Sequence, residues 1–357
     1  MAIVKRVLDF CGQVFFIGLD VHGRFWKVTI RSLGYELKTF SMDPCPEQLH
    51  RYMTKHYPGG TYHTVYEAGF CGFWIHRQLC ELGFHNIVIN PADVPTTGKE
   101  RSQKTDKRDS RKLARELENG SLNGIYVPVE FHQQLRSLCR LRYRTMQNCT
   151  RVKNRIKGLL HFYGYELPPH HEMSHWSGRF INWLSSVELA HVPGRSYLNL
   201  CLEELAEHRR RLTKVMQQLR EYSREPTIAA VLESISSVPG FGFIVSMTLL
   251  TEIVDMSRFS NFDQTACFVG LIPSEHSSGD NEASCGITHR RNKYLRPLVI
   301  EAAWVAIRKD PAMTQAFREL TKRMTPQRAI IRIAKKLLRR VRYVWLNQTK
   351  YVTAVVE

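Results

Sequence analysis

Acidic residues are scarce in this chain of 357 residues. Asp and Glu number 33 against 51 Lys and Arg, which gives a formal net charge of +18 at pH 7. A basic excess of this size is typical of proteins that bind a polyanion, either nucleic acid or an anionic membrane surface. Long apolar runs are missing too, because the longest, such as residues 243–250, are far too short to cross a bilayer. Nucleic acid is therefore the predicted partner, with no membrane association.

Paired cysteines and common cofactor motifs are also missing. The nine cysteines form an odd set without a CxxC pair, and residues 1–16 do not resemble a signal peptide. Reduced thiols and a cytoplasmic location are therefore expected. Residues 96–100 lack the flanking residues of a P-loop, and residues 238–242 do not form a GxGxxG motif. HEMSH (171–175) matches the HExxH zinc pattern, but it follows two prolines and has no obvious third ligand.

Alternating apolar residues, turn residues and helical periodicity predict an α/β domain in the first third of the chain. The expected strands lie at 13–20, 25–32, 35–41, 63–68 and 86–90, and the expected helices at 46–56, 73–83 and 106–119. A hairpin followed by a helix, an acid-bearing strand, a helix and a further strand resembles the ribonuclease-H-like fold.

The rest of the chain is predicted to be mainly helical. Residues 131–165 contain no acid but many cations, and apolar residues recur there at three- and four-residue steps, as they do again at 198–219. This pattern predicts a coiled-coil arm, folded back or used for oligomerisation, although simple helical packing explains it as well. After Pro326 a basic amphipathic helix is expected. The predicted domains are 1–128, a basic coiled-coil region at 129–226, and a serine-bearing domain at 227–357.

Four acids are candidate metal ligands. Asp20 and Glu67 end predicted strands, where ligands of open sheets bind, and Asp106 and Asp109 share one helix face. Carboxylate oxygens suit Mg²⁺ or Mn²⁺, and two such ions can clamp a phosphodiester. Taken alone, Asp106 and Asp109 are more often an ion-paired surface, but the two strand acids favour a metal site. The neighbouring cations would then hold phosphates: Lys104, Lys107 and Arg108.

Other segments carry candidate nucleic-acid contacts. Ser277 and Ser278 precede Gly279 in a predicted loop, and a nucleophilic serine needs positive charge nearby. That charge is available downstream at Arg290, Arg291 and Arg296. The turn before an apolar helix presents backbone amides to phosphates at Gly240 and Gly242, with an ordinary turn as the alternative. In the acid-free helix the candidate phosphate contacts are Arg151, Lys153 and Arg155.

Taken together, these motifs resemble the DEDD transposases of the one-hundred-and-ten family of bacterial insertion sequences. The resemblance rests on IGLDVH, VYEAG, VINP and KTDKRDSRKLA, and then on SVPGFG, FVGLIPSEHSSG and GITHRRNKYLR, in this order from about residue 13 to 310. It implies a RuvC-like N-terminal domain, a coiled-coil linker and a C-terminal transposase domain, in a bacterial cytoplasmic protein associated with the nucleoid.

The resemblance also implies roles for individual residues. Asp20, Glu67, Asp106 and Asp109 would be the metal-binding tetrad, and Ser278 would become covalently joined to DNA through a 5′-phosphoserine. A structured noncoding guide RNA (bridge RNA) would pair with donor and target DNA. The protein would act as a homodimer or homotetramer whose composite sites combine one subunit's tetrad with another's serine.

Two alternative functions remain at the level of the sequence. The chain could be a RuvC-like nuclease or junction resolvase that uses the carboxylates alone. It could also be a non-catalytic nucleic-acid-binding protein in which the acids are structural. Covalent attachment of the protein to DNA separates the transposase from both alternatives.

Overall fold

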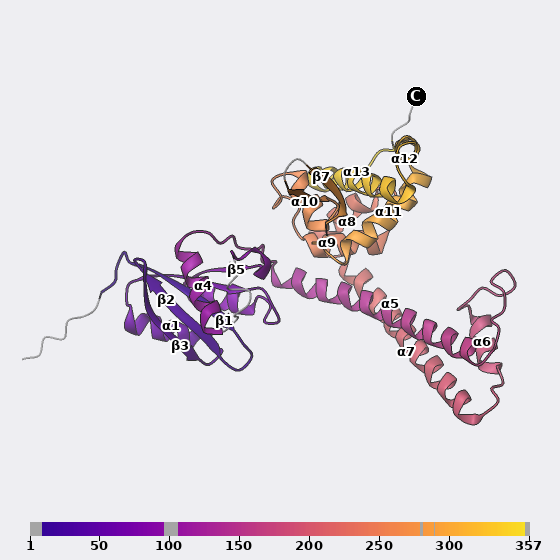
Figure 1. Cartoon of the computed structure of the whole chain (residues 1–357), viewed down its shortest axis with the longest axis horizontal. Helices are drawn as coiled ribbons and strands as arrows, with labels where there is room; N and C mark the ends of the chain where they lie inside the picture. Colours follow the sequence, from indigo (N-terminus) through magenta and orange to yellow (C-terminus); the bar gives the residue numbers. More distant parts are fainter. Residues whose placement is uncertain (1–8, 96–105, 279–280, 289, 354–357) are drawn as a thin grey trace, which may run out of the picture. The chain divides into compact units, whose positions relative to one another are not determined.

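The computed structural model describes residues 9–95, 106–278, 281–288 and 290–353, and at 106–108, 274–278 and 281–286 it describes the backbone. The chain divides after Val127 into two compact units, and each has its own hydrophobic core (Figure 1).

A mixed five-stranded sheet in the order β3-β2-β1-β4-β5 forms the centre of the first unit. β1 pairs antiparallel with β2 and parallel with β4, while β2–β3 is antiparallel and β4–β5 parallel. The elements of this unit are β1 (Val14–Val21), β2 (Trp26–Ser32), β3 (Tyr35–Met42), α1 (Pro46–His56), β4 (Thr61–Glu67), α2 (Trp74–Glu81), β5 (His85–Ile89), the 3-10 helix η1 (Pro91–Asp93) and α4 (Asp106–Glu118).

Helices cover both faces of this sheet. Alternate residues of β1, including Phe15 and Leu19, are fully buried in one core together with Leu49 of α1 and Leu79 of α2. On the opposite face α4 packs directly over the sheet, and its Leu113 shares a second cluster with residues of β4 and β5. A closed layer on each face explains why the central strands have long apolar runs.

The predicted ribonuclease-H-like architecture is confirmed. Each expected strand is present within two residues of its predicted ends, and the helix at 46–56 has the predicted bounds, with Pro46 in its first turn. The chain therefore has the expected fold class: an α/β domain followed by a mainly helical region.

Two long helices form an arm in the second unit. α5 (Glu130–Phe162) and α7 (Val192–Tyr222) pack against each other, and α6 (Gly178–Ser186) completes their core (Figure 1). The arm is thus folded back on itself, which was one of the two predicted arrangements. The segment HEMSH at 171–175 consists of turns rather than helix, so its histidines do not have the helical spacing of a zinc protease.

The remaining helices surround α13 at the base of the arm. Residues of α5 and α7, among them Leu135 and Leu219, share this core with Leu337 of α13, so the predicted second and third domains form one compact unit. α13 is the predicted basic amphipathic helix, with one face fully buried. The other elements are α8 (Pro226–Ser236), α9 (Phe243–Ile253), α10 (Phe262–Val269), β6 (Pro273–Ser278), β7 (Asn281–Ile287), α11 (Leu295–Lys309), α12 (Pro311–Thr321) and α13 (Pro326–Asn347).

The structure corrects the prediction at the serine segment. Residues predicted as a loop form the antiparallel hairpin of β6 and β7, which we call the serine hairpin. Polar residues dominate both strands, so the sequence lacks the alternating apolar pattern that predicts a strand, whereas cross-strand pairing depends on tertiary context. Within the described parts of the chain, no helix is both long and apolar enough to cross a membrane.

Candidate functional site

Two of the predicted metal ligands lie side by side at the carboxyl ends of parallel strands. The pairing of β1 with β4 ends at Leu19 and Tyr66, and the next residues along the two strands are Asp20 and Glu67. Adjacent strands are about 4.8 Å apart, so the two acids occupy neighbouring positions in the same row. The carboxyl edge of parallel strands is where open sheets bind their ligands.

Both acids belong to the face of the sheet that α4 covers. Side chains alternate along a strand, so Asp20 shares a face with Gly18 and Glu67 shares one with Val65. Val65 packs in the same cluster as Leu113 of α4. A Cβ atom on Gly18 would lie 2.1 Å from the backbone oxygen of Ser110, so only glycine permits this close approach of α4.

Two side-chain contacts show in which direction α4 runs across the sheet. Near its end, Glu118 pairs with Arg31 at 2.7 Å, and in its middle Ser110 contacts Thr29 Oγ1 at 3.0 Å. Because Arg31 lies opposite Phe16 and Thr29 opposite Gly18, α4 runs antiparallel to β1. From Ser110 back to the first residue of α4 is about 6 Å, and from Gly18 to the row of strand acids is about 7 Å.

The first turn of α4 therefore lies over the carboxyl edge of the sheet. Asp106 begins α4 and Asp109 follows one turn later, half-buried. The topology thus brings segments more than 80 residues apart to one edge. Lys104 lies outside the described residues, and Lys107 and Arg108 belong to the backbone-described first turn.

His22 is a neighbour of the site that the sequence reasoning missed. Its Nε2 atom lies 3.1 Å from Oδ2 of Asp20, and the Asp20 side chain is only 19% exposed. The signal was present in IGLDVH, because residues two apart on an extended segment lie on one face. His22 therefore contributes to holding the Asp20 carboxylate in place.

The donor set fits a hard divalent cation. Among residues with described side chains, no three Asp, Glu, His or Cys side chains gather closely enough to hold an ion by themselves. The Asp106 side chain, the fourth predicted ligand, is not among them. Carboxylate oxygens, the donors of the four predicted ligands, are the type of ligand that Mg²⁺ and Mn²⁺ prefer.

In the serine hairpin, Ser278 occupies the end of a strand. It is the last residue of β6 and pairs with Asn281, while Ser277 pairs with Glu282. Gly279 lies outside the described residues. Ser278 is thus next to the hairpin turn.

The three arginines after the hairpin have different environments. Arg290 and Arg291 are exposed. Arg296 is 7% exposed, and its guanidinium donates to the backbone oxygen of Thr288. Burial, together with the nearby Arg291 charge, lowers the pKa of Arg296. Arg296 thus stabilises the segment that follows the hairpin by a hydrogen bond to its backbone. The side chains of Arg290 and Arg291 are accessible to solvent.

A buried acid, Glu252, connects α5 to the segment after the serine hairpin, and it was not among the residues predicted from the sequence. Glu252 of α9 is 3% exposed and accepts hydrogen bonds from Arg140 Nε and Asn292 Nδ2 at 2.7 and 2.9 Å. Asn292 in turn accepts from the backbone N–H of Tyr294 at 2.9 Å. Arg140 also lies 4.7 Å from the Tyr294 ring centroid. This network ties α5 to the segment between the hairpin and α11.

The three candidate cations of the arm make different contacts. Arg155 donates to Glu204 of α7 at 2.6 Å, and Lys153 lies 5.4 Å from the Trp176 ring centroid. Burial lowers the pKa of Lys153. Arg151 is exposed and donates to Asn148 within its own helix at 3.1 Å. Arg151 and Arg155 are thus both exposed, but the contact of Arg155 reaches another helix, whereas that of Arg151 stays within α5.

The two glycines of VPGFG lie in unlike positions. Gly240 has φ +91°, and a Cβ atom there would lie 2.2 Å from the backbone oxygen of Ala302 in α11. Its packing role is therefore clear. Gly242 is the N-cap of α9, and a Cβ atom there would meet no atom within 4 Å. Gly242 thus keeps open space at the start of that helix.

Comparison with known proteins finds transposases. A DEDD transposase model of the IS110 type matches residues 17–164, and the model described as "Transposase IS116/IS110/IS902 family" matches residues 232–318. A putative transposase of Sinorhizobium fredii, y4qE, is 29% identical over 67% of this chain, and the alignment spans 57% of that relative's length. The transposase for insertion sequence element IS1111A of Coxiella burnetii is 26% identical over 76% of this chain and 74% of its own.

Proposed function

The chain belongs to the IS116/IS110/IS902 family of transposases, with a DEDD domain followed by a second transposase domain, and we propose that it cuts and rejoins DNA under the guidance of a noncoding RNA. The reaction moves an insertion sequence between donor and target DNA. It uses the acids of the first unit and the serine of the second.

The observation that carries this proposal is the carboxyl edge of the sheet. Asp20 and Glu67 extend one row of paired strands, and the antiparallel course of α4 brings the turn of Asp106 and Asp109 over them. A fold that only bound nucleic acid would have no need to collect acids at one edge, because acids repel phosphates.

A DEDD domain implies a divalent metal ion, which we propose to be Mg²⁺ or Mn²⁺ held by Asp20, Glu67, Asp106 and Asp109. Such an ion supplies positive charge to the oxygens of a phosphodiester as they exchange. The chain's own residues prepare the site: α4 packs on Gly18 without intervening side chains, and His22 contacts the Asp20 carboxylate at 3.1 Å. Preorganised carboxylates do not have to be gathered during the reaction.

Ser278 is the proposed nucleophile. Its hydroxyl oxygen forms a bond to the phosphorus of a DNA phosphodiester, and the bond to the 3′ oxygen breaks. The serine proton passes to solvent, and the leaving 3′ oxygen takes a proton from solvent. The product is a 5′-phosphoserine and a free 3′-hydroxyl, which conserves bond energy for rejoining to another strand. The exposed Arg290 and Arg291 supply positive charge on the same segment of chain.

Guidance by RNA and assembly into a homodimer or homotetramer complete the proposal. The net charge of +18 provides affinity for several phosphate backbones at once. Gly242, Arg151 and the residues around Lys107 and Arg108 are proposed contacts. In a composite site, the tetrad of one subunit would act with Ser278 of another.

A trapped covalent adduct tests the function. The full chain is incubated with Mg²⁺, the RNA of its element and labelled donor DNA. We expect labelled DNA to remain attached to the protein during denaturing gel electrophoresis. Ser278→Ala should bind RNA and DNA but give neither adduct nor product, whereas Ser277→Ala retains both. Asp20→Asn should lose at least about 100-fold in strand exchange, because it removes a ligand's charge without changing its size.

Mass spectrometry of the adduct identifies the attached residue. An adduct on Ser277, or normal products from Ser278→Ala, contradicts the proposed nucleophile. Cleavage by Ser278→Ala that still requires Mg²⁺ and Asp20 indicates the alternative, a resolvase-like nuclease. Full activity of Asp20→Asn, or activity without metal, contradicts the proposed tetrad.

A further inference from the structure

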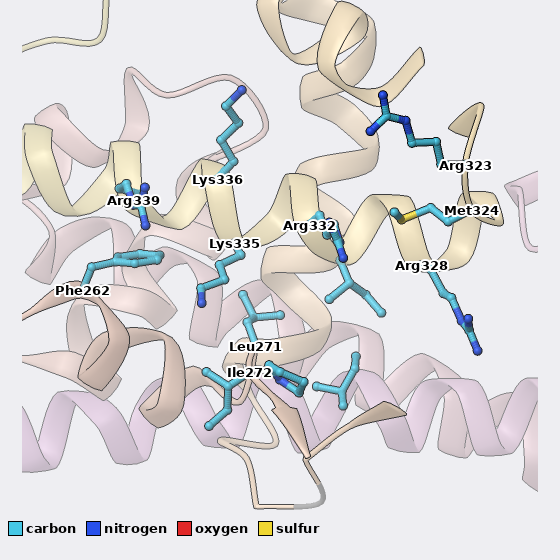
Figure 2. A pocket seen from close by; sticks show the side chains of 13 residues that line it. Phe262, Leu271, Ile272, Arg323, Met324, Arg328, Arg332, Lys335, Lys336 and Arg339 are labelled. Atoms are coloured by element: carbon cyan, nitrogen blue, oxygen red, sulfur yellow. The ribbon is translucent and has the colours of Figure 1, made fainter. Parts of the chain in front are cut away.

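A cavity of about 720 Å³ lies between α10, α13 and the base of the serine hairpin, and we call it the basic groove. Its rim carries a concentration of positive charge, most of it from α13 (Figure 2). These cations are Arg323, Arg328, Arg332, Lys335, Lys336 and Arg339.

Little negative charge balances this rim. Lys335 pairs with Asp263 at 3.2 Å, and Asp263 is largely exposed. Within the described part of the chain, no other carboxylate forms an ion pair with the six cations. So many like charges repel one another, which costs stability unless an anion binds between them. The rim therefore points to a polyanion, and its length indicates one with repeated charges.

The floor of the groove is apolar. It is formed by Phe262 of α10, Leu271 and Ile272 before the hairpin, Ile287 at its end, and Ile331 of α13. In Figure 2 the Arg339 side chain lies over the ring of Phe262, with its guanidinium carbon 4.6 Å from the ring centroid. Proteins that bind single-stranded nucleic acid combine apolar and aromatic surfaces, on which the bases stack, with cations that contact the phosphates. A duplex stacks its base faces inside the helix, so an unpaired strand fits this floor better.

The dimensions agree with a short run of nucleotides. Arg328 and Arg339 are eleven residues apart on α13, a rise of about 16 Å. A stacked strand rises about 3.4 Å per nucleotide along its axis, so this face of α13 spans about four or five nucleotides of such a strand.

The groove adjoins the element that bears the proposed nucleophile. Pro273 and Ile287 line the groove, and they form the first pair of the serine hairpin. Ser278 is five residues further along β6, at the last pair. That separation is about 17 Å along the strand, similar to the length of the groove itself. A DNA strand that reaches Ser278 can therefore continue into the groove.

We propose that the basic groove binds an unpaired DNA strand next to the position at which Ser278 acts. The choice of DNA over RNA rests on the proposed function. Binding in the groove anchors the strand through its phosphates and bases, and the groove itself makes and breaks no bond.

Binding measurements on a triple variant test this site. The full chain in EDTA, where no strand is cut, is titrated with a short fluorescein-labelled single DNA strand at several salt concentrations. Arg328→Gln, Arg332→Gln and Arg339→Gln together should weaken binding at least about tenfold and reduce the salt slope by about 2. The matched control changes three exposed cations elsewhere in the same unit: Arg308→Gln, Lys309→Gln and Arg318→Gln. The control should leave affinity within about twofold, because those cations lie away from the groove.

Each other result overturns the inference. Unchanged affinity, or an equal loss in the control, means that the groove holds no strand. A loss confined to a matching RNA strand means that the occupant is RNA, and an equal loss for duplex DNA means that the bases do not contact the floor. In the unmutated chain, photocrosslinking of iodouracil-substituted DNA should label peptides from α10 or α13. This readout does not depend on whether Ser278 forms an adduct, so it separates failure of the groove from failure of the proposed function.

Discussion

Two helices of the second unit, α5 and α13, are both rich in Lys and Arg but have different surroundings. In α5, Arg140 reaches the buried Glu252, and Arg155 pairs with Glu204. Burial raises the pKa of the neighbouring Cys139 thiol to about 11. In α13, Arg328 and Arg332 are exposed along the basic groove.

This difference shows that the function of a basic helix depends on the acids of other elements. The sequence of α5 is free of acids between residues 131 and 162, which led to the prediction that its cations contact phosphates. Its partners α7 and α9 supply the missing carboxylates, so part of its charge stabilises the fold. α13 has few such partners on its outer face, and its charge remains accessible to a ligand.

Removing the acid under α5 should have the largest effect on stability. Glu252→Ala leaves Arg140 and Asn292 without their shared acceptor, and we expect a loss of about 3 kcal/mol in the free energy of unfolding. The matching change for α13 is Asp263→Ala, which removes the carboxylate that pairs with Lys335. It should lower the free energy of unfolding by less than about 0.5 kcal/mol because Asp263 is exposed. Urea unfolding followed by circular dichroism measures both. Equal losses would remove the distinction between the two helices.

Two adjacent arginines of α13 sharpen the comparison within one helix. Arg340 pairs at 3.0 Å with Asp310, which is fully buried, and also contacts Tyr351. Arg340→Gln should therefore cost about 2 kcal/mol of stability. Arg339→Gln should change stability by less than about 0.5 kcal/mol but weaken binding of single-stranded DNA. Thermal unfolding and fluorescence anisotropy distinguish them, and the reverse assignment would contradict the groove.

The smallest effect is expected on the arm. Arg151→Gln should reduce the salt slope of RNA binding by about 1, because this exposed cation is available to a phosphate. Arg155→Gln should reduce it less, since Glu204 already neutralises Arg155. Filter binding of the element's own RNA at increasing salt measures both slopes. Identical slopes in both variants and the unmutated chain would place the RNA elsewhere.

The fold was largely predictable because its signals are local. The apolar run of β1, the alternation along β2 and the Pro46 helix start follow from backbone geometry that neighbouring residues determine. The family motifs also led to both regions of the candidate site. The serine hairpin was missed because its strands are polar, and strand formation there depends on the partner strand rather than on hydrophobic alternation.

By itself, the sequence determined the order of strands and helices in the first unit, the excess of positive charge and the identity of the candidate acids. Only the tertiary structure decided how the charges are used: Arg140 is paired with an acid 112 residues away, whereas Arg332 remains on the surface of a groove. The physical reason is that the spacing of apolar residues reports local backbone geometry, which extends over only a few neighbouring residues. Electrostatic pairing and burial instead depend on distances in space, and those distances exist only after the chain has folded.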